Sequence, residues 1–424
     1  MQAGVSRRGF LGSALGVGAL AVVPRHVLGG PGHTSPTDVV TRAVIGTGGR
    51  GGGFVLRNAE GAAPKCLAVC DVDDHRRDAA AKRAGKPCQP YTDFRRVLDR
   101  QDIDVVYIAT PPHWHALISI AAAQAGKDIY CEKPMTKFIA EGRAVVNAVK
   151  RYRRIFQIGT FGRFGVSPSD WTRKVMLSGV VRDNGPVVRF IRNWKVRQWS
   201  GRTNLIPQPI PPNLHYDFWL GPAPYKPYHP HRVHGSFRGY WDYDGGGLTD
   251  MGQHWYDPVH YFLGKDGTGP VEIEAYAPWP AHPDACGLWG RLTFRFEDGT
   301  TVIFESEEWG EPEGGDHWFL EGPNGRVKRH GGQTDPPGIW EAVDRLPDPP
   351  RLVSFAEALR TRVDGPGAKP NAEEAHRSVT CLHLCNIAIR LGRKIRWDPA
   401  KEQVVGDEEA NRLVNVPMRA PWHL

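Results

Sequence analysis

Residues 42–51 read RAVIGTGGRG, and this stretch decides the fold of the N-terminal part of the chain. A short apolar run that leads into Gly46, Gly48 and Gly51 indicates a buried strand, a tight turn and the start of a helix. These glycines allow a sharp bend, a close approach of the backbone to a pyrophosphate, and close packing of the helix on the sheet. Because glycine-rich turns also occur for backbone reasons alone, the surrounding pattern has to support the interpretation.

That pattern, a short apolar run followed by a helix-like stretch, continues as far as residue 160. Short buried strands that alternate with helices are typical of a parallel, doubly wound sheet. We therefore expect residues 39–160 to form a Rossmann NAD-binding domain of the α/β class. The apolar runs lie at 42–45, 65–70, 105–109, 128–131 and 155–158.

The choice of cofactor is indicated by Asp71, which ends the second apolar run. It lies about 20 residues beyond Gly51, where a carboxylate bonds the ribose hydroxyls and repels a 2′-phosphate. NAD is therefore expected rather than NADP. Arg50 and the Arg76–Arg77 pair leave room for a phosphate and keep NADP as the alternative.

Two further motifs close later strands: TPPHWH at 110–115 and EKP at 132–134. Ligands of open parallel sheets bind at the carboxyl ends of the strands. Lys133 would then hydrogen-bond a substrate hydroxyl or carbonyl oxygen, unless it is a surface lysine paired with Glu132. The expected cofactor-binding residues are Gly46, Gly48, Gly49, Arg50, Gly51, Asp71, Thr110, Pro111, His113, His115 and Glu132.

In the second half of the chain, DMGQH at 250–254 places Asp250 and His254 four residues apart. Residues i and i+4 share one face of a helix, so Asp250 would orient His254. An imidazole suits the removal of a hydroxyl proton, whereas an ordinary helix histidine is the alternative. A helix break at Pro258, with Asp257 as its cap, would make His260 the reserve candidate.

Residues 190–260 are rich in aromatic side chains among Pro, Gly and His. Aromatic faces stack on sugars, although the same side chains also dominate cores and interfaces. The expected substrate-binding residues are Arg163, Trp199, Tyr240 and Trp241. Further on, alternation at 290–296 and 300–305 around Glu297-Asp298-Gly299 predicts a hairpin of a half-exposed sheet.

The first 30 residues have the features of an export signal. Arg7 and Arg8 precede an apolar stretch from Leu11 to Val23 with small residues near its end. Consecutive arginines match the twin-arginine type, which exports folded proteins, so we expect a periplasmic protein. If the leader is not cleaved, it becomes a membrane tether. The mature chain should have no integral span, which needs roughly 20 apolar residues.

Composition excludes several classes of function. The formal charge is only +8, and the basic run at 150–154 is interpreted as a solvated helix end, so no nucleic-acid partner is expected. Seven cysteines imply no disulfide framework. Their spacing does not fit a zinc site, so no metal is expected.

Together, these motifs resemble the glucose-fructose oxidoreductase, inositol dehydrogenase and rhizopine-catabolism (Gfo/Idh/MocA) family, in its exported, twin-arginine branch. The resemblance also rests on WLGPAP at 219–224, GGG at 245–247, HRS at 376–378 and LGRK at 391–394. It implies an α/β domain over 161–395 with an open, mostly antiparallel sheet. It further implies that a helix at 372–392 packs back towards the active site and that 396–424 forms a C-terminal arm. A homo-oligomer, dimer or tetramer, through the C-terminal sheet is implied as well.

The resemblance also implies an active site made of Lys133, Asp250 and His254. We expect a carbohydrate oxidoreductase with tightly bound NAD(P), in which His254 accepts the hydroxyl proton and Lys133 stabilises the oxygen. Free nicotinamide cofactor is not expected outside the cytoplasm, so the bound cofactor would be recycled in the site.

Two alternatives to the oxidoreductase remain. The first is an NAD-dependent, redox-neutral glycoside hydrolase. The N-acetylgalactosaminidase branch of such enzymes, however, lacks the Glu-Lys-Pro lysine and has Thr-His where this chain has Thr249-Asp250. The second is a non-catalytic sugar-binding protein on the same fold.

Overall fold

The computed structural model places most of the chain beyond residue 38. The expected leader at 1–30 and the candidate substrate residue Trp199 lie outside the described residues. Those that the structure describes are 39–56, 65–161, 163, 173–176, 178–179, 181, 187–192, 202, 204–277, 283–286, 290–306, 318, 320–328, 333–348, 352–363 and 371–424.

The first sheet has six parallel strands in the order β3-β2-β1-β4-β5-β6. This order, with the first strand in the middle, is that of a doubly wound dinucleotide-binding domain, and it confirms the expected fold. The apolar runs become strands because their side chains are buried on both faces. The strands are β1 (Arg42–Ile45), β2 (Cys66–Cys70), β3 (Gln89–Tyr91), β4 (Val105–Ile108), β5 (Asp128–Cys131) and β6 (Phe156–Ile158).

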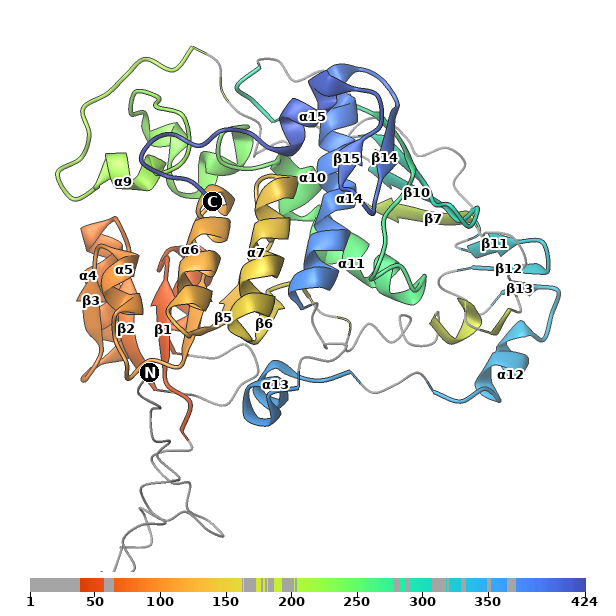
Figure 1. Ribbon diagram of the computed structural model, residues 1–424, viewed down its shortest axis with the longest axis horizontal. Coiled ribbons are helices and arrows are strands. Elements are labelled where there is room, and N and C mark those ends of the chain that lie inside the picture. Colours follow the sequence, from red (N-terminus) through yellow and green to blue (C-terminus); the bar gives the residue numbers. More distant parts are fainter. Residues whose placement is uncertain are drawn as a thin grey trace, which may run out of the picture. The chain divides into compact units, whose positions relative to one another are not determined.

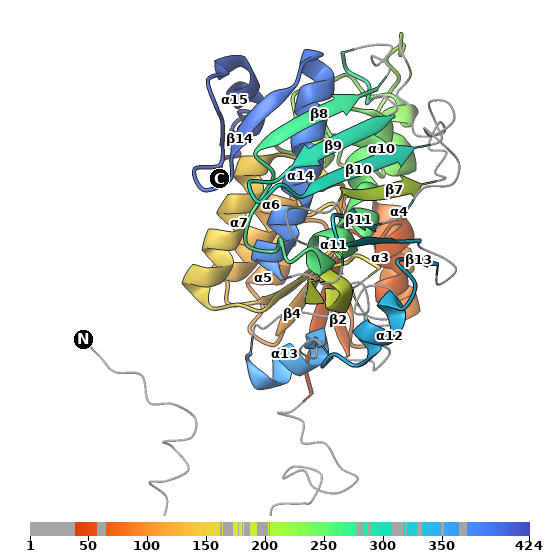
Figure 2. The same cartoon turned by 90° about the vertical axis from the view of Figure 1, so that its right-hand side faces the viewer.

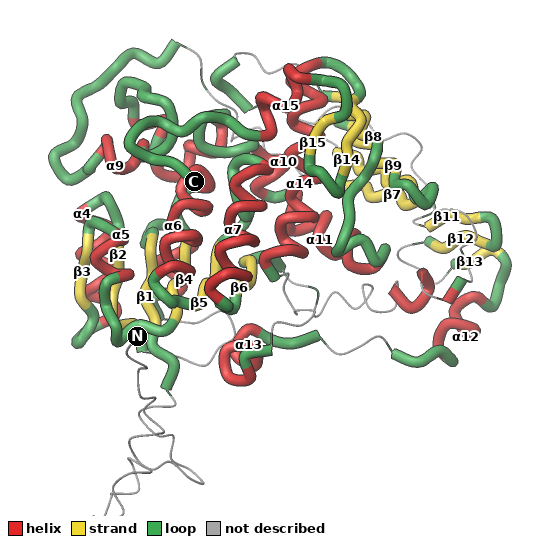
Figure 3. Tube along the Cα trace, in the orientation of Figure 1, coloured by secondary structure: helices red, strands yellow, loops and turns green. Residues whose placement is uncertain are grey.

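Helices connect these strands, and strand and helix alternate along this part of the chain (Figure 3). The Asp73 side chain accepts a hydrogen bond from the backbone N–H of Arg76 and so begins the second helix. The last two of these helices pack side by side (Figure 1). The helices are α3 (Gly49–Phe54), α4 (Asp74–Ala84), α5 (Phe94–Leu98), α6 (Pro112–Gln124) and α7 (Ile139–Tyr152).

The second sheet has nine strands in the order β13-β12-β11-β7-β10-β9-β8-β14-β15 (Figure 2). All of its neighbouring strands pair antiparallel except β7 and β10, so the expected mostly antiparallel sheet is confirmed. The strands are β7 (Val187–Arg192), β8 (Glu272–Tyr276), β9 (Arg291–Arg295), β10 (Thr301–Ser306), β11 (Leu320–Gly322), β12 (Gly325–Val327), β13 (Thr334–Asp335), β14 (Ile395–Asp398) and β15 (Gln403–Val404).

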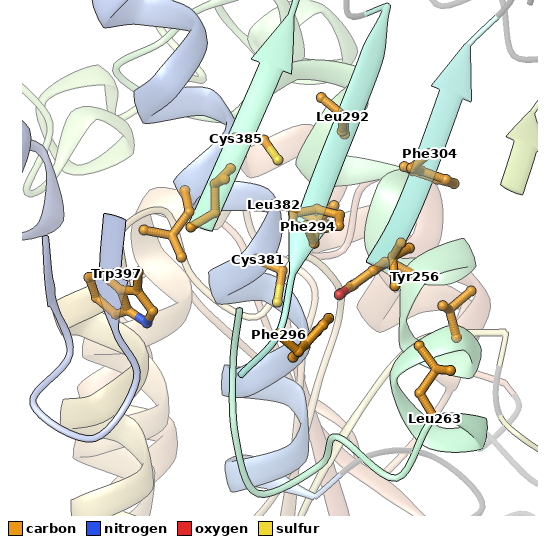
Figure 4. Packing of buried hydrophobic residues seen from close by; sticks show 14 of the residues in the cluster. Tyr256, Leu263, Leu292, Phe294, Phe296, Phe304, Cys381, Leu382, Cys385 and Trp397 are labelled. Atoms are coloured by element: carbon orange, nitrogen blue, oxygen red, sulfur yellow. The ribbon is translucent and has the colours of Figure 1, made fainter. Parts of the chain in front are cut away.

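The predicted hairpin is formed by β9 and β10. Leu292 and Phe294 of β9 point into the core, while the alternate residues Arg291, Thr293 and Arg295 are more exposed. Figure 4 shows the core that results, in which side chains of the hairpin pack against Tyr256 and the α14 helix (Ala372–Leu391).

Helix α14 serves both sheets. Its residues Cys381 and Leu382 belong to the core under the second sheet, whereas Ala375 and Val379 belong to the core of the first. His376 packs so closely on α7 that a Cβ at Gly142 would lie 2.3 Å from the Nδ1 atom of this histidine. Because both cores share this helix, residues Thr41–Leu424 form one compact unit.

Residues 396–424, the expected C-terminal arm, pack against the rest of the chain. Ile395 of β14 pairs with Ile273 of β8, so this segment starts within the second sheet. The chain then returns to the first sheet, where the Trp422 and Trp114 rings meet with their centroids 4.8 Å apart. Burial of apolar and aromatic side chains favours this packing.

The remaining helices of the described ranges follow β7 along the chain. They are α9 (Tyr216–Leu220), η2 (Pro230–Arg232), η3 (His234–Gly239), α10 (Gly246–Asp250), α11 (Gly252–Phe262), α12 (Ile339–Asp344), α13 (Phe355–Thr361) and α15 (Glu408–Val414). Helices α9 to α11 lie between β7 and β8, α12 and α13 between β13 and β14, and α15 after β15. No helix within the described ranges is long and apolar enough to cross a membrane.

Replacing Phe294 with Ala tests the packing of the second sheet. Phe294 is fully buried, so its loss should lower the free energy of unfolding by about 3–5 kcal/mol, measured by urea denaturation. The exposed Glu274 on neighbouring β8 provides the control, since Glu274→Gln should change stability by no more than about 0.5 kcal/mol. Equal effects of the two variants would contradict this account of the core.

Candidate active site

The glycine turn after β1 is shaped by two close approaches. Gly46 has φ +84°, and a Cβ there would lie 2.7 Å from the backbone of Ala109 and Thr110. A Cβ at Gly51 would lie 1.8 Å from the carbonyl oxygen of Gly46. By contrast, a Cβ at Gly49 would meet nothing within 4 Å. Two of the glycines are thus needed for packing of the turn, whereas Gly49 lies against open space.

A cavity of about 620 Å³ opens at the carboxyl ends of β1, β2, β4 and β5. Its volume is within the range of small-molecule sites. The expected catalytic residues Lys133, Asp250 and His254 all line it. The expected cofactor-binding residues that line it are Gly46, Gly48, Gly49, Arg50, Asp71, Thr110, Pro111 and Glu132.

Two polar groups in this cavity suit a dinucleotide. The Asp71 carboxylate, at the end of β2, accepts hydrogen bonds from the backbone N–H of Thr47 at 2.7 Å and of Asp73 at 3.0 Å. These bonds hold it where a ribose would lie. The Thr110 hydroxyl oxygen is buried without a hydrogen-bond partner, as a group awaiting a ligand would be. The residues present therefore fit the cofactor that the glycine turn indicates.

Arg50 and Glu132 come from opposite sides of the same cavity. Arg50 Nε lies 2.9 Å from Glu132 Oε1, and the Arg50 side chain is mostly exposed whereas that of Glu132 is buried. A Cβ at Gly159 would lie 2.5 Å from that same oxygen, so only glycine leaves room for Glu132. This pair links the glycine turn to the end of β5.

His113 and His115 do not line the cavity, which corrects their assignment to the cofactor. His113 is buried and its Nε2 lies 3.0 Å from the Trp219 carbonyl oxygen. The two ring nitrogens of His115 lie 2.7 and 2.8 Å from the carbonyl oxygens of Pro134 and Thr110. Burial lowers the pKa of each imidazole to about 4. His115 thus ties together the two turns that carry Thr110 and Lys133.

The lysine of the EKP motif is paired with Asp250. Lys133 Nζ lies 3.0 Å from Asp250 Oδ2, and the two side chains are 10% and 2% exposed. Arg238 Nε lies 3.1 Å from the same oxygen. One carboxylate therefore lies between two cations on the cavity wall, and the three groups together carry a net positive charge.

His254 is held by a different contact. The backbone N–H of Phe161 donates to His254 Nδ1 at 2.9 Å, and the Phe161 ring stacks on the imidazole at 3.8 Å. An Nδ1 atom that accepts this bond leaves the proton of the neutral ring on Nε2. His254 can therefore accept a substrate proton at Nε2 only after the hydrogen bond to Phe161 opens and the ring proton moves to Nδ1.

The helix that carries these residues breaks earlier than expected. Asp250 ends α10, whereas His254 lies in the first turn of α11, so the two do not share one continuous helix. Pro258 lies inside α11, which corrects the break expected there. His260 is fully buried and does not line the cavity, and burial lowers its pKa to about 3. It is therefore not a reserve base.

Three of the expected substrate-binding residues, Arg163, Tyr240 and Trp241, do not line the cavity either. Arg163 is fully buried and forms ion pairs with Asp257, Asp266 and Glu374 at 2.7–3.2 Å. These ion pairs connect the start of the second domain to α11 and α14.

The other two corrections concern aromatic side chains. Tyr240 is fully buried, and its hydroxyl hydrogen-bonds His231 Nδ1 at 2.7 Å. The Trp241 ring is in contact with Lys137 and Arg390, whose cationic atoms lie 3.5 and 4.1 Å from its centroid. Both residues therefore act in packing.

The residues that take their place on the cavity wall include Phe161, His234, Phe237 and Arg238. The sequence offers little signal for them, because no motif separates Arg238 from its arginine neighbours. Only the packing of η3 over the carboxyl ends of the strands brings it to Asp250.

A doubly wound sheet with a glycine turn and a cavity at its strand ends defines a dinucleotide-binding protein. Residues 40–160 match the oxidoreductase family, NAD-binding Rossmann fold, and residues 171–424 match the oxidoreductase family, C-terminal alpha/beta domain. The chain belongs to this Gfo/Idh/MocA oxidoreductase family, and its first domain is the NAD-binding one.

Individual curated relatives match only part of this chain. A glycosyl hydrolase family 109 protein of Shewanella pealeana is 27% identical over 217 residues, which cover 47% of each chain. A levoglucosan dehydrogenase of Pseudarthrobacter phenanthrenivorans is 37% identical over 113 residues, covering 27% of this chain and 28% of the relative. The chain thus matches less than half of the length of either relative.

Among solved structures, the fold is similar to that of the WlbA dehydrogenase from Bordetella pertussis, determined in complex with NADH and UDP-GlcNAcA. The TM-score is 0.59 at 16% identity, over 85% of this chain and 99% of that one. At 16% sequence identity, this similarity shows a shared fold and nothing more specific.

Gly51→Ala tests the glycine turn. Its methyl group would collide with the Gly46 carbonyl oxygen, so stability should fall by about 1–3 kcal/mol in thermal or urea unfolding. Gly49→Ala is the matched control, because its methyl group meets open space, and stability should change by no more than about 0.5 kcal/mol. If both variants lost the same stability, the close approach would not be what requires glycine at residue 51.

Proposed function

We propose that the protein is an exported oxidoreductase that oxidises a carbinol carbon of a carbohydrate and recycles its tightly bound NAD within the site. The observation that carries the proposal is the Lys133–Asp250 pair, which lies in the same cavity as His254 at the strand ends of an NAD-binding domain. The dehydrogenases among its relatives support the carbohydrate substrate.

The glycine turn and Asp71 would hold the dinucleotide, which would supply the hydride acceptor for the substrate carbon. Lys133 hydrogen-bonds the substrate oxygen as it becomes a carbonyl, and Asp250 orients the ammonium group. His254 takes the hydroxyl proton at Nε2 once the Phe161 contact has opened and the ring proton has moved to Nδ1. The net positive charge of Lys133, Asp250 and Arg238 stabilises negative charge on that oxygen.

The choice of NAD over NADP rests on Asp71. Its carboxylate is held at the end of β2 by two backbone N–H groups, where it repels a 2′-phosphate. Phe161 and Arg238 are the proposed substrate contacts in place of the buried Arg163, Tyr240 and Trp241. We also propose a homo-oligomer formed through the second sheet.

Redox-neutral glycoside hydrolysis is the second candidate, because a family 109 glycosyl hydrolase is among the relatives. The two functions differ in what they release. A hydrolase would free the aryl group of an aryl glycoside with no net change in nucleotide redox state, whereas an oxidoreductase would convert one sugar while reducing another. A chain that bound sugars but did neither would be a binding protein.

Lys133→Met tests the catalytic assignment. Loss of the oxygen-stabilising donor should lower kcat by about 10²- to 10³-fold, while NAD affinity measured by fluorescence titration stays unchanged. Lys401→Met removes an exposed lysine and should leave both quantities as in the wild type. Normal turnover by the Lys133 variant would refute its role.

Cofactor retention is tested by denaturing protein purified without added nucleotide and identifying what is released. We expect NAD(H) in an amount equimolar with the chain, because recycling in the site requires that the cofactor does not leave. A protein that is empty and binds NAD only weakly would contradict in-site recycling, although it would still permit NAD-dependent oxidation.

A further inference from the structure

A cluster of two thiols and a buried guanidinium lies at the opposite end of the first sheet from the cavity. Arg42 and Cys66 are the first residues of β1 and β2, and they are neighbours in the strand register. On the other side of β2, Ala68 pairs with Gln89, the first residue of β3. Cys88 directly precedes β3, and its thiol lies within interaction range of that of Cys66, whose own Sγ donates to the Ala68 carbonyl oxygen at 3.4 Å.

The Arg42 side chain makes this corner of the sheet unusual. It is 1% exposed, and its Nη2 donates to the Val55 carbonyl oxygen at 3.1 Å. The Nε and Nη1 atoms are buried without a hydrogen-bond partner. No carboxylate of the described residues forms an ion pair with this guanidinium. A buried cation without a counterion is unfavourable, so negative charge beside it is stabilised.

Cys66 is the group in position to carry that charge. The hydrogen bond from Cys88 lowers the pKa of Cys66; burial opposes this, and the Arg42 charge adds to the lowering. The same thiol–thiol hydrogen bond raises the pKa of Cys88. In the five remaining cysteines burial raises the pKa of the thiol. Cys66 is therefore the cysteine whose pKa is lowered, and it has a second thiol beside it.

We propose that Cys66 and Cys88 form a reversible dithiol–disulfide couple that is oxidised by small hydroperoxides, with Cys66 as the nucleophile and Cys88 as the resolving thiol. All seven cysteines carry free thiols in this structure, which is the reduced state of the couple. The site is separate from the cavity and from the proposed oxidation of a carbohydrate.

The chemistry balances in two steps. The Cys66 thiolate attacks one peroxide oxygen, an S–O bond forms, the O–O bond breaks, and hydroxide leaves and is protonated to water. Cys88 then loses its proton and attacks the Cys66 sulfur, so that the S–S bond forms and the S–O bond breaks, releasing a second water. The two thiols supply both electrons to the peroxide. Two molecules of a small thiol restore the dithiol by exchange and become a disulfide themselves.

The surroundings favour a small oxidant and a reversible product. Cys66 is 9% exposed and Cys88 is half-buried, so the pair is open to small reagents such as a hydroperoxide. Arg42 stabilises the thiolate, and stabilising the reduced form makes the disulfide easier to reduce. The bond would therefore respond to the redox state of its surroundings.

The first experiment treats the reduced full-length chain with graded hydrogen peroxide, blocks the remaining thiols by alkylation, and maps disulfides by mass spectrometry. We expect a linked Cys66–Cys88 peptide that disappears after dithiothreitol. Cys381 and Cys385, one helical turn apart on α14 and with raised pKa values, are an internal control and should stay reduced. Equal oxidation of both pairs, or no Cys66–Cys88 link when the unfolded chain oxidises normally, would overturn the proposal.

Single variants assign the roles. In Cys88→Ser, peroxide should leave a sulfenic acid at Cys66 that dimedone traps, whereas Cys66→Ser should give no dimedone adduct at Cys88. An adduct at Cys88 with none at Cys66 would reverse the assignment and overturn it. Circular dichroism checks that both variants fold.

The contribution of Arg42 is measured by the rate of dimedone labelling in the Cys88→Ser background. Arg42→Met should slow the oxidation of Cys66 at neutral pH, because loss of the positive charge raises the pKa of Cys66 and lowers its thiolate fraction, and Arg42→Lys should retain most of the rate. If Arg42→Met does not fold, the role of Arg42 is tested by the pH dependence of Cys66 alkylation in otherwise unmodified protein. A midpoint at or above that of a free cysteine peptide would overturn the role of Arg42.

Discussion

The Gln253 side chain is the interaction on which the geometry of the active site depends. Its carbonyl oxygen accepts the backbone N–H of Met135 at 3.0 Å, and its amide nitrogen donates to the Ala375 carbonyl oxygen at 3.0 Å and to Ser378 Oγ at 3.3 Å. The side chain is fully buried, so water cannot take the place of any of these hydrogen bonds, and losing one would leave a buried polar group unpaired. One residue thus connects the turn after β5 with α11 and α14.

This connection matters because the catalytic pair comes from distant parts of the chain. Lys133 and Asp250 are 117 residues apart, and neither sheet alone would bring them together. Gln253 lies between Asp250 and His254 in sequence and bonds the residue that follows Lys133-Pro134. The hydrogen bonds of Gln253 therefore set the distance between the two halves of the site, while α14 holds both cores against each other.

Some of the fold could be predicted from local pattern. β1 and β5 coincide with apolar runs seen in the sequence, because a parallel strand buried on both faces is a continuous apolar run. β3 could not be predicted in this way, since Gln89-Pro90-Tyr91 is short, partly exposed and contains a proline. It forms because the edge of β2 supplies hydrogen-bonding partners, which is information from another part of the chain.

The sequence by itself determined the glycine turn, the doubly wound parallel sheet, and groups at the strand ends such as Asp71 and Lys133, because these depend on short-range backbone geometry and on the common edge of parallel strands. Only the tertiary structure decided how similar side chains divide between the site and the core. Arg163 and Arg238 have the same chemistry, yet Arg163 is surrounded by three carboxylates from α11, the loop after it and α14, whereas η3 carries Arg238 into the cavity. The physical reason is that the buried charge of Arg163 is stabilised by carboxylates from segments far away in the sequence, which no local pattern reveals.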